Sequence, residues 1–292
     1  MKKKVLKAIA LAVALALTAG LALFANALVG NPVSKHLAKN SAEKYIAQKY
    51  ADRDFYIDRV AYDFKGGDYN IFVLSPSSPD SSFSISASFD GKIRWDSYED
   101  RVLSMSNTSE RINREYRQAV DNVFESTTFP YETFIAYGDI EFVNDENVDQ
   151  PFISDYAILM SGLELDGYYD IGELGRKAGR VIVHIYDKDV SIKRLSEVLL
   201  GIKAALNKSG VEFKAIDCVI EPPKPEEGYA DGYNTDSRVE VMQFFSDDIY
   251  EEGLEERVAQ ADKAAKAYND YQDGIKQQEI DAYEKAVSEQ NG

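Results

Sequence analysis

The sequence is poor in the side chains on which most enzyme chemistry depends. Its 292 residues include one cysteine and two histidines. The His-x-x-x-His and Cys-x-x-Cys spacings of common zinc sites are absent. So are the Gly-x-Ser-x-Gly turn of serine hydrolases and a glycine-rich phosphate loop. We therefore expect a protein without catalytic activity, and we expect no cofactor.

The cysteine and the second histidine have simple structural interpretations. Cys218 alternates with isoleucines, which predicts a buried small hydrophobic residue rather than a reactive thiol. His184 lies within the apolar run 180–186, where a histidine in the core or at its edge is the favoured interpretation. Because one cysteine cannot form an internal disulfide, stability must come from packed cores.

Positive charge is also scarce, with 33 basic residues against 50 acidic ones. The net charge is −17, and the first seven residues carry +4, so the remainder carries −21. Such a surface is unsuited to nucleic acid, which requires basic patches, and to docking on anionic lipid. It suits cations or a basic partner, although an acidic surface that simply keeps the protein soluble is the favoured interpretation.

One long hydrophobic run stands at the N-terminus. Lys2, Lys3, Lys4 and Lys7 precede the uncharged stretch 8–34. A basic start followed by an apolar stretch predicts export, with the lysines left in the cytoplasm. A spanning helix needs about 20 residues, so residues 5–29 are long enough for a transmembrane anchor. The alternative is a signal peptide cleaved after Ala27, because Ala25-Asn26-Ala27 fits the small-x-small rule and would release a secreted protein.

The pattern beyond residue 30 predicts an α+β chain of two domains and a tail. Asn31-Pro32 is a good helix start, and residues 31–128 read as a helix-plus-antiparallel-sheet domain. Residues 129–246 read as a small α/β sandwich, with a helix packed on a mixed sheet. Residues 247–292 read as an acidic helical tail that docks on the body, pairs with another chain or stays free.

The expected elements follow hydrophobic periodicity and turn residues. In the strand at 82–89, Phe83, Ile85, Ala87 and Phe89 should face the core, with serines opposite; Ile93 and Trp95 should continue the apolar face. One helix should carry Leu195, Val198, Leu199, Ile202 and Leu206 on its buried side. The predicted helices cover residues 32–50, 99–124 and 191–208, and the predicted strands cover residues 55–64, 69–74, 82–89, 134–143, 180–186, 211–220 and 239–245.

Two acidic stretches are candidate cation sites, because hard cations bind several oxygens on a bent loop. One contains Asp145, Glu146 and Asp149, and the other contains Asp166 and Asp170. Neither matches the EF-hand loop, and solvated loops are the alternative interpretation.

Tyrosine is enriched, with 19 residues. A loop tyrosine offers a large rigid surface with one polar tip, which suits binding. Tyr229 and Tyr233, in the loop 226–233, are therefore candidate binding residues. The alternative is that these rings fold onto a sheet. The serine face of the strand at 82–89 is a second candidate surface.

Three short stretches support a family resemblance. They are Gly30-Asn31-Pro32-Val33-Ser34-Lys35, Ala42-Glu-Lys-Tyr-Ile-Ala-Gln-Lys-Tyr50 and Tyr137-Gly-Asp-Ile-Glu-Phe142. In these the chain resembles the YfjL-like proteins of Gram-positive bacteria. The resemblance implies an uncharacterised, membrane-anchored, extracytoplasmic protein of two domains, and it supplies no catalytic residues.

These features together favour a binding or regulatory module at the cell envelope. Its partner would be an unidentified envelope or membrane protein, and nucleic acid is excluded. Two alternatives stay open: an extracellular hydrolase that uses carboxylates, and a cation-binding envelope protein.

Overall fold

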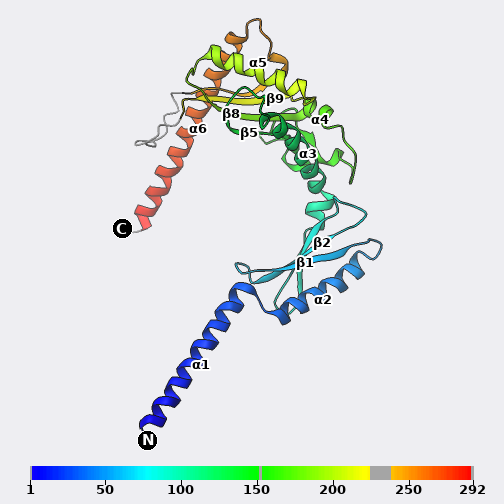
Figure 1. Cartoon of the computed structure of the whole chain (residues 1–292), viewed down its shortest axis with the longest axis vertical. Helices are drawn as coiled ribbons and strands as arrows, with labels where there is room; N and C mark the ends of the chain where they lie inside the picture. Colours follow the sequence, from blue (N-terminus) through cyan, green and yellow to red (C-terminus); the bar gives the residue numbers. More distant parts are fainter. Residues whose placement is uncertain (1, 151–152, 224–237, 291–292) are drawn as a thin grey trace. The chain divides into compact units, whose positions relative to one another are not determined.

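A computed structural model describes residues 2–150, 153–223 and 238–290. The chain is an α+β protein of two compact units (Figure 1). The first unit comprises residues 1–110 and 160–167, and the second comprises residues 111–159 and 168–292. The unit boundary therefore falls inside a helix, and residues 160–167 belong to the first unit although their chain neighbours belong to the second.

The first unit begins with two helices, α1 (Lys2–Val29) and α2 (Pro32–Lys49). As predicted, Asn31 caps α2, and its side-chain oxygen accepts a hydrogen bond of 2.8 Å from the Val33 N–H. Between the helices, Gly30 has a φ of +77°, and a Cβ there would lie 2.7 Å from the Tyr62 ring. Within the described ranges, no helix combines the length and hydropathy of a membrane span.

Four strands form the antiparallel sheet of the first unit, in the spatial order β1-β2-β3-β4. They are β1 (Tyr56–Asp63), β2 (Asp68–Leu74), β3 (Phe83–Ala87) and β4 (Ile93–Asp96). One sheet face buries Ile71, Val73 and Ile85 against Ala42 and Ile46 of α2. This is the expected helix on an antiparallel meander.

The prediction from sequence was wrong for two aromatic residues, one in this sheet and one just after β3. Phe89 and Trp95 were expected to face the core, yet both are exposed. Strand β3 ends at Ala87, so Phe89 lies in the turn before Gly91 and no longer follows the strand alternation. The register shifts between Ser86 and Ala87, which pairs Trp95 with Ser86 and puts Trp95 on the serine face.

The predicted helix 99–124 is divided in two. A π-helical turn, Glu99–Leu103, is followed by α3 (Ser106–Phe124). Met105 between them has a φ of +61°, a left-handed conformation that breaks the helical path. In the second unit, Tyr116 of α3 packs against three glycines (Gly138, Gly175 and Gly179) whose missing side chains make room for it.

The second unit is built on a mixed four-stranded sheet in the order β10-β9-β8-β5. Its strands are β5 (Thr133–Ile140), β8 (Gly179–Tyr186), β9 (Ala215–Glu221) and β10 (Val239–Phe245). Strands β8 and β9 are parallel and joined through α5 (Ile192–Lys208), and the other neighbours are antiparallel. Helix α4 (Ile171–Ala178) precedes β8, and short strands β6 (Phe142–Val143) and β7 (Ile158–Leu159) form a separate parallel pair.

The core of the second unit lies between this sheet and α5. The expected helix face is confirmed, because Leu195, Val198, Leu199, Ile202 and Leu206 are fully buried. Cys218 is also fully buried, as predicted, and burial raises the pKa of its thiol. The sequence left open whether the tail docks, pairs with another chain or stays free. The tail forms α6 (Leu254–Gln290), which packs on β10 and α5 through its first turns, where Leu254 and Val258 are buried.

Candidate functional site: a cleft beside the edge strand β10

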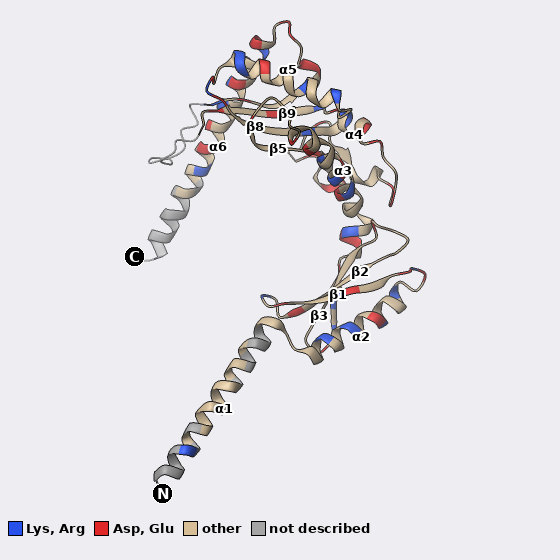
Figure 2. Ribbon diagram, in the orientation of Figure 1, with Lys and Arg blue, Asp and Glu red and all other residues tan. Residues whose placement is uncertain are grey.

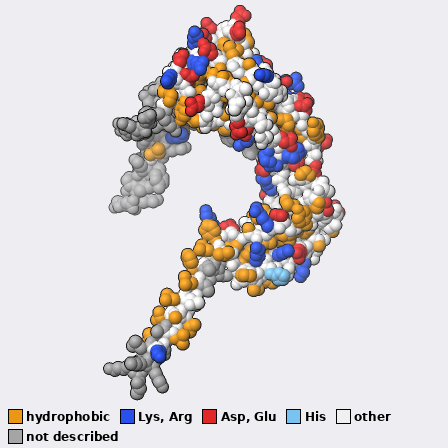
Figure 3. Space-filling model, viewed as in Figure 1, with side chains coloured by type: hydrophobic (Ala, Val, Ile, Leu, Met, Phe, Trp, Pro, Cys, Tyr) orange, Lys and Arg blue, Asp and Glu red, His pale blue; other side chains and the backbone are white. Residues whose placement is uncertain are grey.

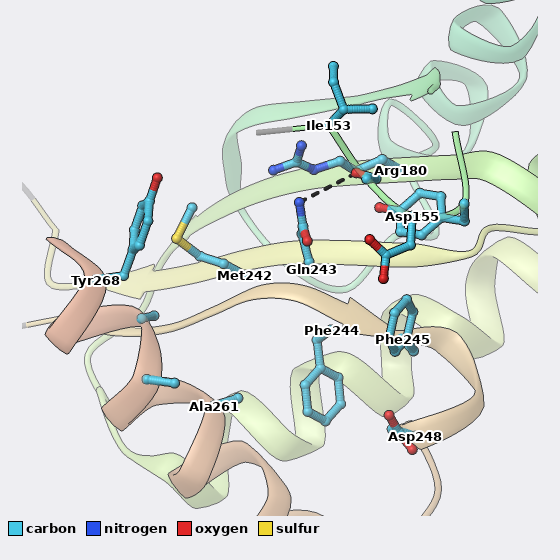
Figure 4. A pocket seen from close by; sticks show the side chains of 14 residues that line it. Ile153, Asp155, Arg180, Met242, Gln243, Phe244, Phe245, Asp248, Ala261 and Tyr268 are labelled. Carbon is cyan, nitrogen blue, oxygen red and sulfur yellow. Dashed lines mark hydrogen bonds between the residues drawn. The ribbon is translucent and has the colours of Figure 1, made fainter. Parts of the chain in front are cut away.

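A cleft of about 790 Å³ lies in the second unit beside β10. Its walls come from the segment 153–156, the end of β10 and the first half of α6 (Figure 4). In this view Met242 and Tyr268 stand at one end, and Phe245 and Asp248 at the other. The lining consists of Ile153, Ser154, Asp155, Tyr156, Arg180, Met242, Gln243, Phe244, Phe245, Asp248, Ala261, Ala264, Ala265 and Tyr268.

A β-bulge in the edge strand shapes the floor of the cleft. The pairing of β10 with β9 is regular up to Val241 and resumes at Phe244, which leaves Met242 and Gln243 unmatched. Gln243 has a φ of +48°, which is rare for a residue with a side chain. The Asp217 side chain holds this conformation by accepting a 2.7 Å hydrogen bond from the Gln243 N–H. The Gln243 amide donates to Ser154 at 3.4 Å, the dashed line in Figure 4.

An ion-pair group fixes Asp217 in turn. Arg180 donates to Asp217 from Nε (3.1 Å) and Nη2 (2.5 Å), and from Nη1 to Glu141 at 3.1 Å. Burial disfavours the charged guanidinium, but the two carboxylates outweigh it and raise the pKa of Arg180. A chain of charge-assisted hydrogen bonds therefore stabilises the bulge, and such bonds are stronger than hydrogen bonds between neutral groups.

The remaining walls are largely apolar and aromatic. On the α6 side the cleft is lined by the small side chains of Ala261, Ala264 and Ala265. Met242, Phe245 and Tyr268 keep 42%, 40% and 54% of their surface exposed. Tyr156 contacts the edge of the Phe245 ring, and its buried hydroxyl has no hydrogen-bond partner in the described part of the chain. Burial raises the pKa of Tyr156.

Helix α6 blocks the edge of β10 upstream of the bulge. Asp262 accepts a 3.0 Å hydrogen bond from the backbone N–H of Glu240. The Glu240 carboxylate accepts from Asn269 at 2.7 Å and pairs with Arg238 at 3.1 Å. An exposed strand edge invites pairing with another chain, and here the side chains of α6 prevent it at Glu240. Beyond Glu240, the β10 residues Met242 to Phe245 line the cleft.

Comparison of the chain with models of known protein families identifies the family to which it belongs. The chain matches the model of the YfjL-like N-terminal domain over residues 2–124 and that of the YfjL-like C-terminal domain over residues 115–259. The chain belongs to the YfjL-like family. The resemblance inferred from the sequence is thereby confirmed.

Other comparisons add little to the YfjL-like assignment. No curated protein was found to match. Among solved structures, the chain is similar to the crystal structure, at 2.55 Å resolution, of a DUF5037 family protein from Ruminococcus gnavus ATCC 29149. The identity is 14%, the TM-score is 0.22, and the match covers 77% of this chain and 98% of that one.

In this YfjL-like chain the carboxylates of the two predicted cation sites are exposed or cap backbone N–H groups. Asp145 and Glu146 lie in a 3-10 turn (Asp145–Asn147), and Asp149 follows it; all three are exposed. Asp170 caps α4 by accepting from the Glu173 N–H at 3.0 Å. Asp166 belongs to the first unit. It accepts from the Asp80 N–H at 2.9 Å, and its own N–H donates to the Asp80 carboxylate at 3.2 Å.

Those contacts give Asp166 and Asp170 structural roles as caps of backbone N–H groups. Within the described ranges, no three acidic, histidine or cysteine side chains are close enough to hold a metal ion. The two candidate binding tyrosines, Tyr229 and Tyr233, lie outside the described residues. Both sets of residues stay predictions from sequence.

Neither histidine is among the described lining residues of the cleft. His184 contacts the Phe134 ring edge-on, and burial lowers the pKa of His184. His36 is hydrogen-bonded to Asn40 on the same helix. The sequence did not reveal the cleft because its lining combines four segments that are distant in the chain. The alanine-rich stripe of the tail, with Ala261 and Ala265, was the one hint of a surface that a neighbour could approach.

Proposed function

We propose that this YfjL-like protein is a binding module of the cell envelope. Residues 5–29 would anchor it in the membrane with the N-terminus in the cytoplasm, and the two units would lie outside. It would act by holding a partner in the cleft beside β10, without catalysing a reaction.

The anchoring part of the proposal is supported by α1. After Lys7 the helix carries no Lys, Arg, Asp or Glu (Figure 2). The apolar side chains of α1 that the structure describes are exposed, among them Leu11, Leu17, Leu21 and Phe24 (Figure 3). A helix whose apolar side chains are exposed is expected to lie in an apolar environment. The basic residues before it favour a cytoplasmic N-terminus.

The binding part rests on one observation, the composition of the cleft. A preformed apolar cleft with a few fixed polar groups is the usual form of a binding site. Among its described lining residues there is no histidine, cysteine or lysine to serve as a base or nucleophile near neutral pH. Gln243 is held in a costly conformation by the residues around it, and such strain clusters at functional sites.

Photocrosslinking in living cells tests this proposal. Benzoylphenylalanine is placed at Met242, inside the cleft, and the adducts are analysed after illumination. We expect a discrete adduct with another protein. Ala264→Trp, which fills the cleft from the exposed face of α6, should abolish the adduct. Ala267→Trp, also exposed on α6 but outside the lining, should leave it unchanged. An absence of any adduct, or equal adducts in both variants, would contradict the proposal.

The hydrolase alternative is tested by the two carboxylates of the cleft, Asp155 and Asp248. A hydrolase of this kind needs both, one as an acid and one as a base or nucleophile. Under the binding proposal, Asp155→Asn and Asp248→Asn change only the strength of crosslinking at Met242. A hydrolytic activity of the purified protein that either substitution abolishes would favour the hydrolase.

A further inference from the structure

We propose that the cleft takes a short, extended segment of a partner polypeptide that combines basic and apolar side chains. This inference rests on the proposed binding function and names the chemistry of the partner. Four properties of the cleft support it: its walls, its free hydrogen-bonding groups, the covered strand edge and its charge.

The walls fit apolar side chains. Met242 and Tyr268 stand at one end of the cleft and Phe245 at the other, with the alanines of α6 beside them (Figure 4). Each of these three large side chains is partly exposed, so it can still bury surface against a ligand. Aromatic and methionine side chains in a concave site are the groups that contribute most to peptide binding.

The free polar groups match a peptide bond, which presents one donor and one acceptor. Arg180 uses three of its N–H groups on Asp217 and Glu141, and its other two have no partner among the described residues. Those two N–H groups can donate to a peptide carbonyl. The Gln243 side-chain oxygen accepts no hydrogen bond from the described residues either, so it can accept from a peptide N–H.

The covered edge limits the length of the segment. A peptide that added to the whole of β10 would need the outward N–H of Glu240, which Asp262 already occupies. Only the bulge and the residues after it, from Met242 to Phe245, are accessible from the cleft. The occupant is therefore a short extended segment and not a long added strand.

The charge favours basic side chains on that segment. The second unit contains 36 of the 50 acidic residues and 19 of the 33 basic residues, so it carries the whole net charge of −17. Within the cleft, Asp155 and Asp248 face one cation, Arg180, which Asp217 and Glu141 already neutralise. Three further cations lie near the Phe245 end of the cleft. The Lys214 amine is 5.1 Å from the Phe245 ring centre, the Lys203 amine donates to the Ser246 and Ile249 carbonyls, and Arg257 donates to the Asp248 carbonyl. A basic segment is therefore attracted by the net charge of the second unit as a whole. Complementary charge both speeds encounter and selects partners.

Fluorescence anisotropy tests the inference on the full-length chain in nanodiscs of phosphatidylcholine, with empty nanodiscs as the blank. The probe is a labelled ten-residue peptide that alternates lysine with phenylalanine or leucine. One comparison peptide has glutamate for lysine, and another has serine for the apolar residues. We expect both comparison peptides to bind at least about tenfold more weakly.

Matched variants separate the cleft from general attraction to an acidic surface. Tyr268→Ala should weaken binding about fivefold or more. Tyr271→Ala, an exposed tyrosine on the same helix outside the cleft, should change it less than about twofold. Equal losses in the two variants, or equal binding of the lysine and glutamate peptides, would overturn the inference.

Gln243→Gly gives a second, independent test. Glycine adopts a φ of +48° without strain, so the variant should be as stable as the wild type or more so. It removes the proposed acceptor, so peptide binding should weaken about threefold to tenfold. Unchanged binding would refute the role of Gln243. If the Met242 crosslink forms in cells while the lysine peptide does not bind, this inference fails and the binding function stands; if both are absent, both fail.

Discussion

Asp96 is the residue whose replacement should most clearly destabilise the first unit. Its side chain is only 4% exposed, yet it is charged. It accepts hydrogen bonds from the Lys49 amine at 2.8 Å, the Tyr50 hydroxyl at 3.2 Å and the Tyr98 N–H at 3.0 Å, and also from the Tyr45 hydroxyl. Through these contacts Asp96 joins strand β4 to helix α2.

The expected cost of Asp96→Asn is about 3 kcal/mol of unfolding free energy at pH 7. Asparagine has the same shape but one acceptor oxygen, so it loses at least one of the hydrogen bonds to a charged group, each of which contributes about 1.5–3 kcal/mol. Lys49 is 46% exposed. Its ion pair is therefore screened by water, and losing it adds no more than about 1 kcal/mol.

The difference between wild type and variant should depend on pH. Burial alone would raise the pKa of Asp96, but the hydrogen bonds from Lys49 and Tyr45 outweigh it and lower that pKa. A carboxyl with a lowered pKa in the folded state stabilises the fold above its unfolded pKa, about 3.9, and loses this contribution as the pH falls below that value. The cost of Asp96→Asn should therefore be constant from pH 7 to pH 5 and shrink below about pH 4.

Urea unfolding followed by tryptophan fluorescence measures this cost. The chain has one tryptophan, Trp95, next to Asp96, so the signal reports the first unit. With a slope of about 2 kcal/mol per molar urea, the midpoint should fall by about 1.5 M. Asp58→Asn, an exposed carboxylate on β1, should shift the free energy by less than about 0.5 kcal/mol. An unchanged midpoint for Asp96→Asn at pH 7, or a cost that does not decrease as the pH falls below about 4, would refute the reasoning.

Three further substitutions test other parts of the structure. Gly175→Ala should lower the melting temperature although alanine favours helices, because the added Cβ would lie 2.2 Å from the Glu212 carbonyl oxygen. Tyr69→Phe should cost about 1–2 kcal/mol and speed hydrogen exchange at the Asn31 amide, whose N–H donates to the Tyr69 hydroxyl at 2.7 Å. Leu254→Ala should cost about 2–4 kcal/mol and expose α6 to limited proteolysis, because Leu254 docks that helix.

The sequence was sufficient to predict a feature where a local pattern of residues alone determines it. The Asn31 cap depends on two adjacent residues, and the buried face of α5 depends on spacing within one helix, so neither needs distant information. The alternation of β3 was read correctly until the strand ended, at a register shift that depends on pairing with β4. Trp95 was misplaced for that reason.

The cleft could not be predicted, because it depends on contacts between distant segments. Gln243 has an ordinary sequence context, and its positive φ arises from Asp217, 26 residues earlier. Asp217 is held by Arg180, another 37 residues earlier. Docking of α6 completes the cleft, and its alanine-rich stripe was too weak a signal to choose between a docked and a free helix. The acidic character of the chain beyond residue 7 was clear from composition, but its concentration in the second unit and its relation to a cleft were not.

Thiol labelling of intact cells tests most directly the central claim, a cleft outside the membrane that is open to a partner. Cys218 is fully buried, so the wild-type chain should remain unlabelled by a membrane-impermeant maleimide. Met242→Cys, in the cleft, should be labelled in intact cells, and the lysine–phenylalanine peptide should protect it. Lys3→Cys should be labelled only after lysis. Labelling of Met242→Cys only after lysis would place the cleft in the cytoplasm and contradict the account.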